Sequence, residues 1–120
     1  MPHINQTALE NFFQDDTELL IDLAIFFAQA LGDCKARLNY SVDNQDTFTL
    51  CETIHLLKGR LGYFSATGLK DLASTIELQG KESQLNDIRP ILAELLAGIE
   101  EMMCELREIT GMPLMYEADE

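Results

Sequence analysis

A histidine, a lysine and two glycines stand at helical spacing in the middle of the chain. They are His55, Lys58, Gly59 and Gly62, within the segment 54–64 that reads IHLLKGRLGYF. Residues three and four apart share one face of a helix, so these four lie on one stripe. A neutral imidazole is nucleophilic near pH 7, and an ammonium one turn away stabilises a phosphoryl group placed on it. These residue types predict phosphoryl transfer through His55.

The two glycines bear on how a phosphoryl group would be delivered. A glycine in a helix interior costs about 1 kcal/mol relative to alanine, yet Gly59 and Gly62 both stand beside His55. Missing side chains let a second protein bring its own active site in line with the imidazole nitrogen. The spacing leaves one alternative open, in which the histidine has no function and the glycines only allow close helix packing.

Helical periodicity runs through the rest of the chain, and no segment has a convincing strand pattern. A Thr7–Glu10 capping box predicts a short first helix, and a long second helix is expected from Asp15 or Asp16 to about Val42. The third is expected from near Asp46 to residue 64, and the fourth from residue 69 to a C-terminal glycine at Gly80. The last is expected from near Asp87 to about residue 110, with Pro90 in its first turn. The third helix has an apolar stripe beside the histidine stripe, formed by Leu50, Ile54, Leu57, Leu61 and Phe64.

Four amphipathic helices with short connections predict an all-α fold, an antiparallel up-and-down four-helix bundle with a short extra N-terminal helix. We expect one domain over residues 1–110, and an acidic, flexible C-terminal tail over residues 111–120. The start at Met1, the length and the acidic end indicate a free-standing protein, with a fragment of a larger kinase left open.

The charge balance limits the classes of partner. The chain has 8 Lys and Arg against 21 Asp and Glu, a formal net charge of −13. Nucleic acids and anionic membranes need clustered bases, so neither is an expected partner. Acids and bases are equal in number between residues 52 and 82, so the histidine stripe lies in the least acidic part of the chain.

Three cysteines without a CxxC pair are expected to be small buried hydrophobes of a reducing compartment. No signal-peptide pattern is present, and the apolar runs are too short to cross a bilayer. These observations favour the cytoplasm.

The segment IHLLKGRLGYF, followed by SATGLKDLASTIE, resembles the histidine phosphotransfer (HPt) family. The matching positions of its signature are His55, Leu57, Lys58, Gly59 and Gly62. Upstream, FFQDDTELLIDLAIFFAQAL resembles the family's Asp-x-Glu-Leu-Leu helix, and the resemblance spans about residues 10 to 110. It implies a phosphorelay intermediate, in which His55 accepts a phosphoryl group on Nε2 from the aspartyl phosphate of one receiver domain and passes it to another.

The resemblance also implies what each site residue does. Lys58 would stabilise the phosphoryl group, and Gly59 and Gly62 would give access to the incoming receiver. Glu77 would bond the other imidazole nitrogen and so fix the tautomer, while Lys81 would add charge. A solvated pair of Glu77 and Lys81 on one helix is the alternative for these last two.

The same resemblance implies that the chain is a phosphocarrier rather than an enzyme, without a cofactor of its own, because in the family the receiver supplies Mg²⁺ and most catalytic groups. No Gly-rich nucleotide loop is present in the sequence. Leu56, Tyr63 and exposed parts of the long second helix are the expected docking residues. A non-phosphorylated adaptor that binds and blocks a receiver is the alternative function.

Two positions depart from the family pattern. Arg60 stands where the family usually has a small residue, and its role is open. Ser65 stands where the family usually has glycine. Two further candidates are weaker: His3 is expected at a disordered terminus without a function, and the Glu52–His55 spacing suits a metal-binding bundle but has no second copy.

Overall fold

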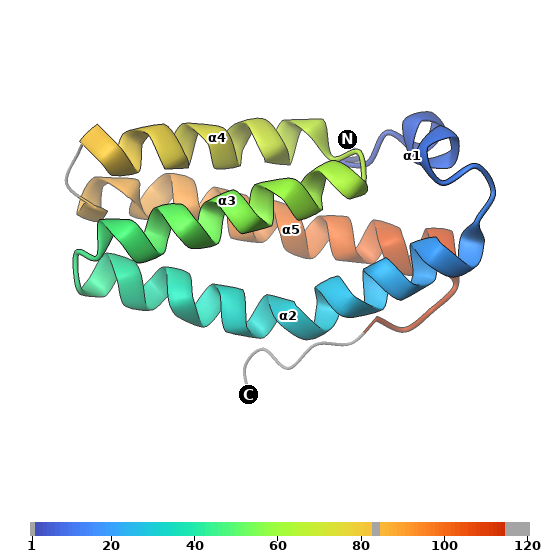
Figure 1. Cartoon of the computed structure of the whole chain (residues 1–120), viewed down its shortest axis with the longest axis horizontal. Helices are drawn as coiled ribbons and strands as arrows, with labels where there is room; N and C mark the ends of the chain where they lie inside the picture. Colours follow the sequence, from blue (N-terminus) through green and yellow to red (C-terminus); the bar gives the residue numbers. More distant parts are fainter. Residues whose placement is uncertain (1, 83–84, 115–120) are drawn as a thin grey trace.

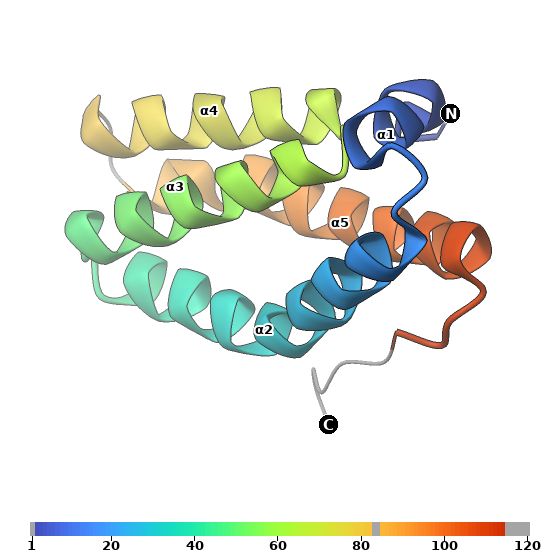
Figure 2. The same cartoon turned by 45° about the vertical axis from the view of Figure 1, so that its right-hand side comes forward.

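The computed structural model describes residues 2–82 and 85–114. Within these residues the chain forms five α-helices and one short 3₁₀ helix. In chain order they are α1 (Gln6–Phe13), α2 (Thr17–Asp43), α3 (Thr47–Tyr63), α4 (Thr67–Glu82), η1 (Leu85–Ile88) and α5 (Arg89–Thr110). The helices α2 to α5 run alternately up and down the bundle, and α1 lies at one end of it (Figures 1 and 2). The predicted all-α bundle with a short N-terminal helix is therefore confirmed.

Side-chain caps fix where the first three helices begin. Asp16 accepts a hydrogen bond from the Leu19 amide at the start of α2, and Asp46 accepts one from the Thr49 amide at the start of α3. Both starts agree with the sequence prediction. The predicted Thr7 cap is wrong, because Asn5 caps α1 two residues earlier.

The rotation of α3 about its axis is set by burial. The five residues of its predicted apolar stripe are at most 1% exposed, and they pack into one core with side chains from α2, α4 and α5. The most extensive contacts of α3 are with α4, followed by those with α2. Because the apolar stripe faces the core, the histidine stripe faces outward. Within the described residues, no helix is both long and apolar enough to cross a bilayer.

The connection between α4 and α5 differs from the prediction. Gly80 does not end α4, which continues to Glu82. Instead Gly80 is buried, and a Cβ there would lie 3.0 Å from a methyl carbon of Leu50, so its role is close helix packing. Between α4 and α5, Leu85 and Ile88 of η1 join the core. Pro90 does occupy the first turn of α5, as predicted.

Both ends of the described chain pack onto the bundle. The predicted disorder at His3 is wrong, because Glu105 accepts the backbone amides of His3 and Ile4 at 2.8 and 2.9 Å. At the other end, Arg107 donates to the carbonyls of residues 113 and 114, and Leu114 is buried. Leu114, within the predicted tail, therefore packs on the bundle, and residues 115–120 lie outside the described residues.

Candidate functional site

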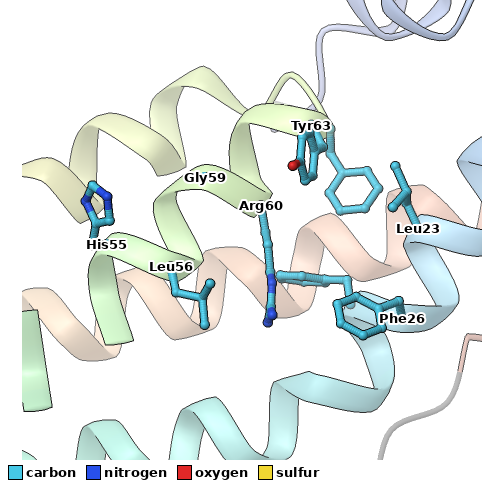
Figure 3. Close-up of a pocket in the computed structure, with 9 residues that line it drawn as sticks. Leu23, Phe26, His55, Leu56, Gly59, Arg60 and Tyr63 are labelled. Carbon is cyan, nitrogen blue, oxygen red and sulfur yellow. The ribbon is translucent and has the colours of Figure 1, made fainter. Parts of the chain in front are cut away.

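His55 lies on the outer face of α3. Its neighbours Ile54 and Leu57 are fully buried, which leaves the imidazole pointing to solvent with 74% of the side chain exposed. Figure 3 shows the ring projecting from α3 at one end of a surface groove. An exposed, unobstructed imidazole is what a group delivered by another protein requires.

A carboxylate on α4 faces the imidazole. Glu77 Oε2 lies 3.5 Å from His55 Nδ1, and Glu77 Oε1 accepts a hydrogen bond of 2.8 Å from Lys58 Nζ. This hydrogen bond, helped by the charges of Lys58, His55 and Lys81 and opposed by partial burial, holds the pKa of Glu77 below its ordinary value. Glu77 is therefore an anion at neutral pH, and it stands on the Nδ1 side of the ring.

The ion pairs of Glu77 decide between two sequence interpretations. A solvated pair with Lys81 was one of them, but Glu77 pairs with Lys58 and His55 across the α3–α4 contact, while Lys81 acts on it only through longer-range charge. Lys58 was expected to face a phosphoryl group. In the structure its ammonium donates to Glu77, one turn of α3 from His55.

The two glycines of the stripe have different surroundings. A Cβ at Gly59 would meet nothing within 4 Å, so this position is open space beside His55. A Cβ at Gly62 would lie 3.5 Å from Lys70 Nζ, which reaches over α3 from α4. Gly59 therefore faces open space, whereas a Cβ at Gly62 would be in ordinary contact with the end of the Lys70 side chain.

A groove of about 490 Å³ runs from His55 along the α2–α3 contact. The lining residues are Leu23, Phe26, Phe27, His55, Leu56, Gly59, Arg60, Tyr63 and Phe64. Leu56 and Tyr63, both predicted as docking residues, are about half exposed. Phe26 was not singled out from the sequence, although a signal exists. Phe27 belongs to the apolar stripe of α2, and the next residue along a helix lies about 100° further round the axis. Phe26 is accordingly more than half exposed while Phe27 is buried.

The remaining candidates do not gather into a second centre. Among residues 2–82 and 85–114, no three His, Cys, Asp or Glu side chains come together as a metal ion would require, so Glu52 and His55 have no further ligand there. The three cysteines are unpaired. Cys34 is buried as predicted, whereas the same prediction is wrong for Cys104, which is exposed on α5.

Comparison with known families agrees with this geometry. The model of the Hpt domain matches residues 8–108, most of the chain. The chain belongs to the Hpt domain family. No curated protein and no solved structure gives a significant match.

The departure of this Hpt domain at Ser65 has a backbone explanation. Ser65 connects α3 to α4 with φ of 56°, a left-handed conformation that glycine adopts without cost and other residues rarely adopt. The Ser65 amide and carbonyl are both used, in bonds to Gly62 and from Asn5. The serine therefore keeps the glycine-type turn of the family pattern at some cost in strain.

Proposed function

We propose that the chain is a histidine phosphotransfer protein of a two-component phosphorelay. His55 accepts a phosphoryl group from the aspartyl phosphate of one receiver domain and passes it to a second receiver. The observation that carries the proposal is an exposed imidazole whose Nδ1 faces an anion while the surface beside it is open at Gly59. Hpt domains are phosphocarriers rather than enzymes, and the matched region agrees with that class.

The roles of the site residues follow from their positions. The Glu77 carboxylate favours the tautomer with hydrogen on Nδ1, which leaves the lone pair on Nε2 for attack at phosphorus. The N–P bond forms as the bond from phosphorus to the aspartyl oxygen breaks, and the donor carboxylate is released. The developing imidazolium is stabilised by Glu77, a role analogous to that of the carboxylate in a catalytic triad.

In this scheme Lys58 contacts both Glu77 and the phosphoryl group. An ammonium has three N–H donors, so Lys58 can keep its hydrogen bond to Glu77 and donate another to the phosphoryl oxygens. Mg²⁺ and the remaining catalytic groups belong to the receiver, so this chain acts as a cytoplasmic phosphocarrier without an ATP site. Unpaired cysteines support a reducing compartment.

The test is phosphoryl transfer from a receiver domain. The purified chain is mixed with a ³²P-phosphorylated receiver and Mg²⁺, and we expect label on the chain that is stable in alkali and lost in acid. His55→Gln should abolish it. His3→Gln is the matched control, because the chain has only two histidines, and it should accept label at the wild-type rate.

Three results would argue against this scheme. Label that persists in His55→Gln excludes His55 as the acceptor. Label lost in His3→Gln as well would point to a folding effect rather than chemistry. A receiver that binds the wild-type chain without passing label to it favours the adaptor, which occupies the receiver and blocks it.

A further inference from the structure

Arg60 is the charged side chain of the groove that phosphoryl chemistry does not use. It follows His55 by five residues, which is about 7.5 Å along α3 and roughly 140° around the helix axis. Its guanidinium carbon lies 5.1 Å from the centroid of the Phe26 ring on α2. Figure 3 shows the side chain directed toward Phe26 and away from His55. Arg60 therefore lies too far round the helix to hold a phosphoryl group on the imidazole.

The guanidinium of Arg60 has no carboxylate partner among residues 2–82 and 85–114. This is notable in a chain of 21 acids and 8 bases, where Arg37 and Arg89 are both paired with aspartates. Arg60 also lies beside the buried thiol of Cys34. Burial raises the pKa of that thiol and Arg60 opposes the rise, but a thiol is only a weak acceptor and leaves the donors of a guanidinium largely unused.

The contact with Phe26 leaves Arg60 free to bind one kind of ligand. The aromatic ring attracts the cation without using its N–H groups, and a guanidinium can make two parallel bonds to a carboxylate. The walls of the groove on either side are apolar, formed by Leu23, Leu56 and Tyr63. The groove therefore suits an acidic side chain with apolar neighbours.

We propose that Arg60 is a specificity-determining residue, which binds an Asp or Glu side chain that the receiver domain inserts into the groove between α2 and α3. The net charge of −13 repels an acidic surface over most of the molecule, so a single unpaired arginine in the groove fixes where such a surface docks. The inference rests on the proposed function for the identity of the partner. It goes beyond that function in naming the group that is recognised.

The experiment measures docking separately from chemistry. A receiver domain that binds the wild-type chain is titrated calorimetrically into Arg60→Met, and the dissociation constant is determined. Methionine keeps an apolar, unbranched side chain at this position but removes the charge and the hydrogen-bond donors. We expect Kd to rise about tenfold or more. Arg89→Met removes the same charge at a surface pair outside the groove, and its Kd should stay within about twofold of wild type.

A small phosphodonor removes docking from the reaction. Phosphoramidate needs no protein surface, so Arg60→Met should be labelled by it at the wild-type rate. If this rate falls, Arg60 acts on the phosphoryl group and the proposal is overturned. It is also overturned if Arg60→Met leaves Kd unchanged, or if Arg89→Met raises Kd equally, which would mean a general effect of charge.

Two further arms keep the result decisive. Should Arg60→Met not fold, Arg60→Lys retains charge without the planar fork; a several-fold rise in Kd supports the proposal and an unchanged Kd overturns it. A receiver that binds wild type far better than Arg60→Met, yet passes no label to either, would keep this inference while overturning phosphotransfer through His55.

Discussion

At the scale of single residues, the site depends on one carboxylate with two neighbours. Glu77 lies against His55 Nδ1 with one oxygen and accepts the hydrogen bond of Lys58 with the other. The same anion therefore orients the imidazole and holds the ammonium close to it. This linkage predicts that the ionisation of Glu77 contributes to the stability of the folded chain.

The first prediction concerns acid pH. The Lys58 hydrogen bond lowers the pKa of Glu77 in the fold from its ordinary value of 4.5. A carboxyl group with a lowered folded pKa stabilises the fold above its unfolded pKa, and this stability is lost as pH falls through the folded value. We therefore expect the free energy of unfolding to fall more steeply below pH 4.5 in wild type than in Glu77→Gln.

Urea unfolding at a series of pH values from 6 downward measures this difference. Lys58→Met is the matched control, because it removes the hydrogen bond that lowers the pKa and should flatten the same part of the profile. Identical pH profiles for wild type and Glu77→Gln would contradict the assignment.

At the scale of the helices, glycines at different positions act in opposite ways. Gly59 faces open space on α3, whereas a Cβ at Gly98 on α5 would lie 2.5 Å from a methyl carbon of Leu69 on α4. Gly98 and Leu69 are both buried, so the Leu69 side chain would have to shift within the core to admit the Cβ. Gly98 permits two helices to approach, while the fold itself gains nothing from Gly59.

The second prediction compares the same substitution at these two sites. Gly59→Ala should raise the free energy of unfolding by about 0.5–1 kcal/mol, because alanine is the better helix former and has room. Gly98→Ala should lower it by about 1–2 kcal/mol, because overpacking exceeds the gain in helix propensity. Urea denaturation measures both.

Function should respond in the reverse order. Gly59→Ala places a methyl group where a receiver must approach His55, so its rate of labelling by a phosphorylated receiver should fall, while labelling of folded Gly98→Ala stays near wild type. A lower free energy of unfolding in Gly59→Ala, or an unchanged rate of transfer from the receiver, would show that Gly59 is not kept for access.

At the scale of the whole molecule, the N-terminal segment is held by the last helix. Glu105 accepts the amides of His3 and Ile4, and His3 Nε2 lies 2.7 Å from Glu101 Oε1. The Asn5 amide also donates to the Ser65 carbonyl in the α3–α4 turn. Phe12 of α1 stacks on Tyr63, which lines the groove. The segment therefore connects α5 to the end of the groove.

The third prediction tests this attachment. Glu105→Ala removes the acceptor of two backbone amides, and we expect the free energy of unfolding to fall by about 1–2 kcal/mol. Hydrogen exchange at the His3 and Ile4 amides should become fast. Amides in the middle of α3 should still exchange only through global unfolding, as in wild type. Glu108→Ala, on the same helix, is the control; slow exchange at both amides in Glu105→Ala would contradict the role of Glu105.

Much of the fold was accessible from the sequence because its signals are local. Apolar spacing gave the helices and the buried face of α3, and Asp16 and Asp46 marked two helix starts through hydrogen bonds that span three residues. The position of His55 outside the core followed from the same helical spacing. Such features depend on neighbours within one or two turns, so a sequence pattern is sufficient to predict them.

The tertiary structure decided which distant residues meet. Glu77 on α4 pairs with Lys58 on α3 rather than with Lys81 on its own helix. Gly80 allows close packing from inside a helix instead of ending one, and His3 lies against α5. Arg60, unexplained by its neighbours in sequence, has its guanidinium over the ring of Phe26 on another helix. Spacing along the chain does not encode the rotation and separation of packed helices, and these contacts depend on both. The sequence determined that the chain presents a histidine on an open helical face, while only the packed bundle decided which groups surround it.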